Sequence, residues 1–132
     1  GKEFGTVTGR RRRCGWFDAV LVRQGIKLNG ANGLALTKLD VLDGIDELKV
    51  CTAYHCGDLT FNRLPAAADI QSKVEPVYET FEGWNQPTTG ITSYEDLPET
   101  TQQYIQFIAD FIGVPVKIIS TGPGRDEIIQ IN

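Results

Sequence analysis

The sequence predicts one mixed α/β domain in which helices flank a mixed sheet. Short apolar segments with the spacing of strands intermingle with longer segments of helical spacing, and no internal repeat is visible. A length of 132 residues has room for one hydrophobic core and hardly for two. No linker-like stretch interrupts the chain, so we expect residues 1–132 to form a single unit.

The first half of the chain is expected to hold one helix, two strands and a hairpin. Asn29-Gly30 is a typical helix stop, and Gly57-Asp58 is a typical hairpin turn. The expected elements are a helix from Trp16 to about Leu28, strands at Gly33–Leu36 and Glu47–Tyr54, and a hairpin or longer excursion over residues 55–69.

The second half is expected to hold a strand, a loop, a helix and two further strands. Pro76 favours an edge position for the first strand, and Asp96 or a nearby residue is expected to cap the helix. The expected elements are strands at Val74–Phe81, Val116–Ile119 and Ile128–Ile131, a loop at 83–90, and a helix from Pro98 to Gly113. The apolar stripe expected on this helix consists of Tyr104, Ile105, Ile108, Phe111 and Ile112.

Four consecutive arginines, Arg10–Arg13, end a glycine- and threonine-rich loop on an acidic chain. The net charge is −4, and without these arginines 9 basic residues face 17 acidic ones, a net of −8. Glycine lets a backbone approach a ligand closely, and arginine binds carboxylate or phosphate through paired hydrogen bonds. The loop Gly5–Arg13 therefore indicates a site for a small anion. A solvated basic turn and a polynucleotide contact are the alternatives, although the chain lacks a general basic face.

Two further turns follow apolar strands, at Thr37-Lys38-Leu39-Asp40 and at Ser120-Thr121-Gly122-Pro123-Gly124. A carboxylate such as Asp40 can accept hydrogen bonds from both N1–H and the exocyclic amine of guanine, a donor pair that adenine lacks. The aliphatic stem of Lys38 can cover the face of a base. A guanine site is therefore one interpretation of these turns, and ordinary strand exits are the other.

The cysteines and the single histidine indicate no metal site. Cys51, His55 and Cys56 match no closed zinc pattern, and a fourth ligand is missing. Cys51 is instead expected in the core of a strand, and His55 at the surface or in a hairpin. The three cysteines of the chain favour reduced thiols in the cytoplasm, and no apolar run reaches the roughly 18 residues of a membrane span.

Taken together, these segments resemble the adenylosuccinate synthetase family over almost the whole chain. The resembling stretches are GKEFGTVTGRRRRCGWFD, KLNGANGLALTKLDVLDGIDELKVCTAY, VEPVYETFEGW and GVPVKIISTGPGRDE. The resemblance implies a larger, P-loop-related α/β fold and a GTP-dependent ligase that joins IMP and L-aspartate to form adenylosuccinate, with GDP and phosphate. It also implies Mg²⁺, a cytoplasmic homodimer acting in AMP biosynthesis, and no nucleic-acid or membrane partner.

The resemblance assigns roles to two groups of residues. The substrate loop, which closes over aspartate, would contain Thr6, Val7, Thr8, Gly9, Arg10, Arg11 and Arg12. Within it, Arg10 would contact aspartate and IMP, and Arg12 would approach GTP. The guanine site would contain Lys38, Leu39, Asp40, Ser120, Thr121 and Gly122. Val7 departs from the family, because many members have threonine there, so one hydroxyl that aspartate could use is lost.

The chain is expected to be a carboxy-terminal fragment of such an enzyme. It contains no methionine and begins at its most unusual motif. The family's phosphate-binding loop, Mg²⁺ ligands and catalytic aspartate and histidine belong to the amino-terminal part, so the fragment alone should be inactive. The alternative is a stand-alone guanine-nucleotide-binding module without catalysis.

Overall fold

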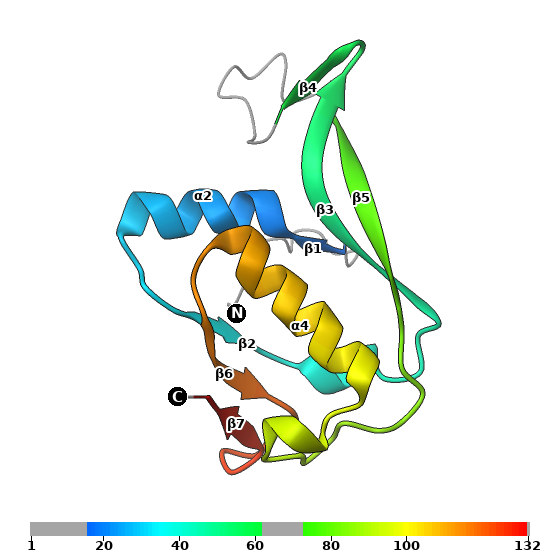
Figure 1. Ribbon diagram of the computed structural model, residues 1–132, viewed down its shortest axis with the longest axis vertical. Helices are drawn as coiled ribbons and strands as arrows, with labels where there is room; N and C mark the ends of the chain where they lie inside the picture. The colour runs from blue at the N-terminus through cyan, green and yellow to red at the C-terminus, as the bar shows by residue number, and fades with distance from the viewer. Residues whose placement is uncertain (1–15, 62–72, 132) are drawn as a thin grey trace. The chain divides into compact units, whose positions relative to one another are not determined.

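The computed structural model describes residues 16–61 and 73–131, which divide into two compact units (Figure 1). The first unit comprises Gly1–Gly30 and Lys49–Thr80, and the second comprises Ala31–Leu48 and Phe81–Asn132, each with its undescribed residues set aside. Because both units are discontinuous in the chain, no linker in the sequence marks the division. The loop Gly5–Arg13 lies outside the described residues.

The first unit is built around a sheet in which β3 is the shared strand. β1 runs parallel to β3 with Phe17 opposite Val50, and β4 runs antiparallel to β3 with Tyr54 opposite Phe61. β5 also pairs with β3. The elements are β1 (Phe17–Asp18), α2 (Ala19–Asn29), β3 (Glu47–Cys56), β4 (Leu59–Phe61) and β5 (Glu75–Glu82), with the unit boundaries falling inside β3 and β5.

Helix α2 begins at Ala19, so the prediction that the helix includes Trp16, Phe17 and Asp18 was wrong. Phe17 and Asp18 pair with β3 instead, and this long-range pairing overrides the helical spacing of the apolar residues. Asp18 is the N-cap, since its carboxylate accepts a hydrogen bond of 3.0 Å from the Leu21 amide. The predicted stop at Gly30 is confirmed, because Gly30 has φ 67° and caps the helix from the left-handed region.

Cys51 lies in the core of the first unit, as predicted for a strand residue. Its side chain is 2% exposed, and burial, together with the negative charge of Asp18, raises the pKa of the thiol to about 12. The neighbouring Tyr54 hydroxyl donates to the Asp18 carboxylate, and burial with this bond raises the pKa of Tyr54.

The Cys51 thiol is expected to be inert toward alkylating reagents while the protein is folded. A pKa of about 12 lies above a working pH of about 8, so about one thiol in ten thousand would be ionised there. Peptide mapping by mass spectrometry after iodoacetamide treatment would show Cys51 modified in urea and unmodified in buffer. Full modification in buffer within minutes would contradict the buried placement.

The second unit contains a three-stranded sheet with β6 at its centre. β2 runs parallel to β6, and β7 runs antiparallel to β6 with Ile119 opposite Ile129. Helix α4 lies over one face of this sheet (Figure 1). The elements are β2 (Leu34–Leu36), the 3-10 helix η2 (Leu39–Leu42), the 3-10 helix η3 (Tyr94–Asp96), α4 (Glu99–Ile112), β6 (Val116–Ser120) and β7 (Ile128–Gln130).

The apolar stripe predicted for α4 is largely confirmed. Its buried members are Tyr104, Ile105, Ile108 and Ile112. Phe111 is only half-buried, and it stacks on Phe107 one turn earlier, with ring centroids 6.0 Å apart. Phe81 and Trp84 pack edge-on against Tyr104, with centroids 5.9 and 5.7 Å away.

The ends of α4 follow proline and glycine chemistry. Of the predicted caps, Asp96 or a nearby residue, the N-cap is Pro98, and Asp96 instead ends the preceding 3-10 helix. The amides at the start of a helix have no intrahelical partner. Proline suits this position because it has no N–H group to leave unpaired. Gly113 ends the helix with φ 90°, as predicted. No helix among residues 16–61 and 73–131 has both the length and the apolar character that crossing a bilayer requires.

Candidate functional site

The parallel pairing of β2 and β6 brings the two predicted turns together. Leu36 lies opposite Ile119, one residue before the end of β6. The carboxyl ends of neighbouring parallel strands meet at the same edge of a sheet, where ligands of α/β proteins commonly bind. Residues 37–40 and 120–122 therefore leave the sheet side by side, with η2 directly after β2 (Figure 1).

Lys38 turns the chain sharply at the end of β2. Its backbone has φ 59° and ψ 41°, and it is the only residue other than glycine with positive φ among those that the structure describes. This conformation costs roughly 1–2 kcal/mol for a residue with a side chain, and such strain is concentrated at functional sites. The turn leaves the Lys38 side chain exposed and places Leu39 in the core, where it is 3% exposed.

Asp40 lies half-buried in the first turn of η2. Its carbonyl oxygen accepts a hydrogen bond of 3.1 Å from the Asp43 amide, which fixes the backbone. Its carboxylate forms no hydrogen bond or ion pair with the residues that the structure describes. Both carboxylate oxygens are therefore free to accept hydrogen bonds from a ligand.

Thr121 holds the second turn from inside the protein. Its side chain is fully buried, and its hydroxyl donates to the Ile91 carbonyl at 2.9 Å. Its amide donates to the Glu127 carbonyl at 2.8 Å, and its carbonyl accepts from the Gly90 amide at 3.1 Å. The Ser120 hydroxyl donates to the Gly122 carbonyl at 3.3 Å, which closes the turn on its outer side. Since internal bonds occupy the polar groups of the buried Thr121, Ser120 and Gly122 are the members of this turn that a ligand could reach.

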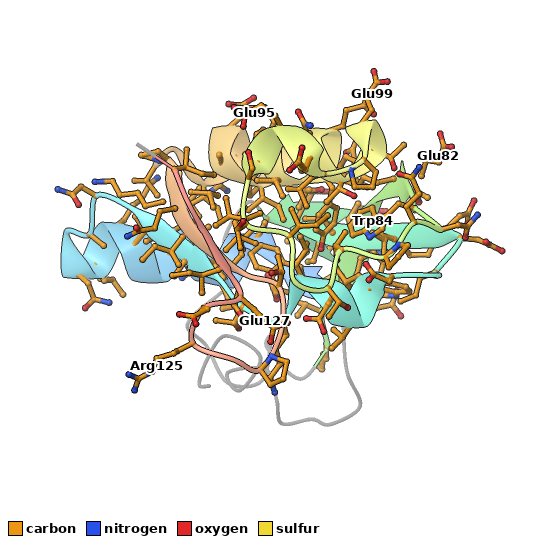
Figure 2. The ribbon with its side chains drawn as sticks, turned by 90° about the horizontal axis from the view of Figure 1, so that it is seen from below. Glu82, Trp84, Glu95, Glu99, Arg125 and Glu127 are labelled. Carbon is orange, nitrogen blue, oxygen red and sulfur yellow. The ribbon has the colours of Figure 1, made fainter. Side chains whose placement is uncertain are left out.

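Glu127 fills the inside of the turn between β6 and β7, where Figure 2 labels it. Its carboxylate accepts a hydrogen bond of 2.8 Å from the Gly124 amide. A Cβ atom on Gly122 would lie 2.5 Å from the Glu127 carboxyl carbon, and one on Gly124 would lie 2.9 Å from its Oε1. The turn can close around this carboxylate only because glycine occupies both positions.

Asp43 is a second functional candidate of this region, and it was not predicted from the sequence. Its carboxylate accepts hydrogen bonds from Trp84 Nε1 at 2.8 Å, from the Thr88 hydroxyl at 2.7 Å and from the Thr88 amide at 2.7 Å. Trp84 is 3% exposed and Thr88 is fully buried. Nothing in the local sequence separates Asp43 from the neighbouring acidic residues Asp40 and Asp46.

The structure thus brings together one of the two predicted groups of residues. Lys38, Asp40, Ser120 and Gly122 lie in adjacent turns, and Leu39 and Thr121 support them from the core. The substrate loop, with Thr6, Val7, Thr8, Gly9, Arg10, Arg11 and Arg12, lies outside the described residues. His55 lies in the β3–β4 hairpin, as predicted, and its Nε2 is 3.4 Å from a Glu75 carboxylate oxygen.

Comparisons with known proteins agree over most of the chain. The family model described as adenylosuccinate synthetase matches residues 1–129. An adenylosuccinate synthetase of Anaplasma marginale (strain St. Maries) is 54% identical over 132 residues, which are 100% of this chain and 31% of that protein. A solved structure of the fully ligated adenylosuccinate synthetase from Plasmodium falciparum is 31% identical, with a TM-score of 0.83. That match covers 90% of this chain and 29% of the other. The chain therefore spans about a third of the length of these relatives.

Proposed function

Because this chain belongs to the adenylosuccinate synthetase family, we propose that it is the carboxy-terminal part of a GTP-dependent ligase. The ligase would join IMP and L-aspartate to form adenylosuccinate, GDP and phosphate in AMP biosynthesis. The proposal rests chiefly on one observation, the adjacency of the Asp40 turn and the Ser120–Gly122 turn at the carboxyl ends of β2 and β6. An edge of this kind suits a nucleotide.

In the proposed guanine site, Asp40 reads the edge of the base. Its two free carboxylate oxygens would accept from N1–H and from the exocyclic 2-amine, two donors that guanine presents side by side. The methylene stem of the exposed Lys38 would cover one face of the base. Ser120 and Gly122 would border the base from the neighbouring strand, while Leu39 and Thr121 hold the two turns in place.

In the proposed substrate loop, arginines neutralise anionic substrates. Arg10 would bind the carboxylate of aspartate and lie close to the ribose of IMP, and Arg12 would approach GTP. Thr6, Val7, Thr8, Gly9 and Arg11 would complete the loop. Support comes from the charge pattern, since four adjacent arginines on an otherwise acidic chain attract small anions, and from the family match over residues 1–129.

The chemical step would require the part of the enzyme that precedes this chain. We assign the phosphate-binding loop, the catalytic residues and the Mg²⁺ ligands to that part. Bound Mg²⁺ would neutralise charge on the phosphates of GTP. No group of three or more His, Cys, Asp or Glu side chains within residues 16–61 and 73–131 is placed to hold a metal ion. The full-length enzyme is proposed to be a homodimer.

The proposal is tested by comparing the full-length protein with the isolated 132-residue chain. The full-length protein is expected to convert IMP and aspartate into adenylosuccinate, detected by chromatography, with one GTP consumed per product. The isolated chain is expected to form no product, because the phosphate-binding loop and the catalytic residues are assigned to the rest of the enzyme. ATP in place of GTP provides the control for base recognition.

Two results would contradict the proposal. Equal use of ATP and GTP by the full-length protein would remove the guanine site. GTP binding by the full-length protein without product formation would support a guanine-binding module in place of a ligase.

A further inference from the structure

The loop of residues 83–91, hereafter the 83–91 loop, is bonded to the chain that leaves β2. Asp43 lies at the end of η2, and its carboxylate accepts the three hydrogen bonds from Trp84 and Thr88 described above. The Gly44 amide adds a bond of 2.9 Å to the Trp84 carbonyl. The Asp43 amide in turn donates to the carbonyl of Asp40, the residue proposed to read the base. One further hydrogen bond therefore connects the loop to Asp40.

The other end of the same loop is bonded to the turn that leaves β6. The Gly90 amide donates to the Thr121 carbonyl at 3.1 Å, and the Thr121 hydroxyl donates to the Ile91 carbonyl at 2.9 Å. Within the loop, the Ile91 amide donates to the Thr88 carbonyl at 3.1 Å. Thr88 and Thr121 are both fully buried, so water does not compete for these bonds.

The loop therefore connects two turns that the pairing of β2 with β6 positions relative to each other only at their starting points. The ladder between β2 and β6 fixes Leu36 against Ile119, but both turns bend away beyond those residues. In Figure 2, Trp84 lies between α4 and the end of η2. It contacts Tyr104 of α4 and donates to Asp43, so it attaches the loop to both elements. The continuous path runs from Asp40 through Asp43, Thr88 and Ile91 to Thr121.

We propose that Asp43 and Thr88 are positioning residues for guanine recognition, an inference that rests on the function proposed above. They touch no ligand in this role. By bonding the 83–91 loop to η2, they set the distance between the Asp40 carboxylate and Ser120–Gly122. This distance is the width of the space that would receive the base. A base edge held by two hydrogen bonds tolerates little error in this width.

The test is a pair of substitutions at Thr88 in the full-length enzyme. Thr88→Val keeps the shape and the amide bond but removes the hydroxyl that donates to Asp43. The expected result is a KM for GTP raised about 3- to 10-fold, the value of one buried hydrogen bond, with kcat and the KM for IMP unchanged. Thr88→Ser retains the hydroxyl and is expected to restore the KM for GTP.

A readout of base geometry separates positioning from general weakening. Inosine triphosphate lacks the 2-amine, so the ratio of kcat/KM for GTP to that for inosine triphosphate reports the contact of the amine with Asp40. Thr88→Val is expected to lower this ratio about 3- to 10-fold. Thr89→Val, at the adjacent exposed threonine, is the matched control and should keep the wild-type ratio. Asp43→Asn, which keeps the size of the side chain, gives the same readout if Thr88→Val does not fold.

The outcomes distinguish this inference from the proposed function. A folded Thr88→Val enzyme with an unchanged ratio would overturn the positioning role, as would an equal loss of activity with both nucleotides. If Asp40→Asn also leaves the ratio unchanged, the guanine site itself is wrong. If the ratio changes for Asp40→Asn but not for Thr88→Val, only the positioning role is wrong.

Discussion

Asp40→Asn in the full-length enzyme is expected to lower kcat/KM for GTP about 100-fold and to shift preference toward xanthosine triphosphate. Guanine presents two adjacent hydrogen-bond donors, whereas the asparagine side chain offers one acceptor and one donor. The asparagine NH2 group would therefore face a donor of the base, and one charge-assisted hydrogen bond would be lost. The loss corresponds to roughly 3 kcal/mol. Xanthine has a carbonyl in place of the amine, so it complements the asparagine amide.

The measurement is steady-state kinetics with GTP, xanthosine triphosphate and inosine triphosphate at saturating IMP and aspartate. Asp46→Asn provides a matched control, because Asp46 is an exposed carboxylate in the same segment and is expected to retain the wild-type preference. Thermal unfolding should be nearly unchanged for both variants, since the Asp40 carboxylate makes no bond within the described residues. An unaltered order of the three nucleotides for Asp40→Asn would remove the role given to that residue.

Gly83→Ala is expected to produce the largest loss of stability among single substitutions considered for the second unit. A Cβ atom at this position would lie 1.7 Å from the Ile45 carbonyl oxygen and 3.0 Å from that of Asp46. Both obstacles are backbone atoms, so no side-chain rotation can relieve the overlap. The shift would also disturb the bond of 2.8 Å from the Gly83 amide to the Asp46 carbonyl. We expect a destabilisation of about 3 kcal/mol or more.

Urea denaturation followed by circular dichroism would measure this loss, and Gly25→Ala serves as its counterpart. Gly25 lies inside α2, and a Cβ atom there would meet nothing within 4 Å. Replacing a helical glycine by alanine should therefore raise the free energy of unfolding by about 0.5–1 kcal/mol. Equal midpoints for the two alanine variants would contradict the close approach at Gly83.

The elements with local signals could be predicted from the sequence. Gly30 and Gly113 follow apolar stripes of helical spacing, and both end helices in the left-handed conformation that glycine adopts most readily. Phe17 and Asp18 were assigned to the helix because their spacing fits it. Their pairing with β3, more than thirty residues away, could not be read from the neighbouring residues.

From the residues alone, the candidate site was predictable as two separate turns, and only the family resemblance implied that they form one site. Asp40 and Ser120 each follow an apolar strand, which local patterns indicate. That β2 and β6 are neighbours and parallel depends on contacts distant in the chain. Asp43 was missed for a related reason. The sequence does not distinguish a carboxylate with three hydrogen bonds from a solvated one, and the partners of Asp43, Trp84 and Thr88, lie more than forty residues away.

The distance along the chain between Leu36 and Ile119 has a consequence for synthesis and folding. These paired residues are 83 positions apart, so closing the ladder between them is entropically costly and slow compared with forming α4. During translation, β2 and the turn with Asp40 that follows it would leave the ribosome long before β6 exists. At the proposed guanine site, a nucleotide would therefore be expected to stabilise this unit only once β6 had been added beside β2.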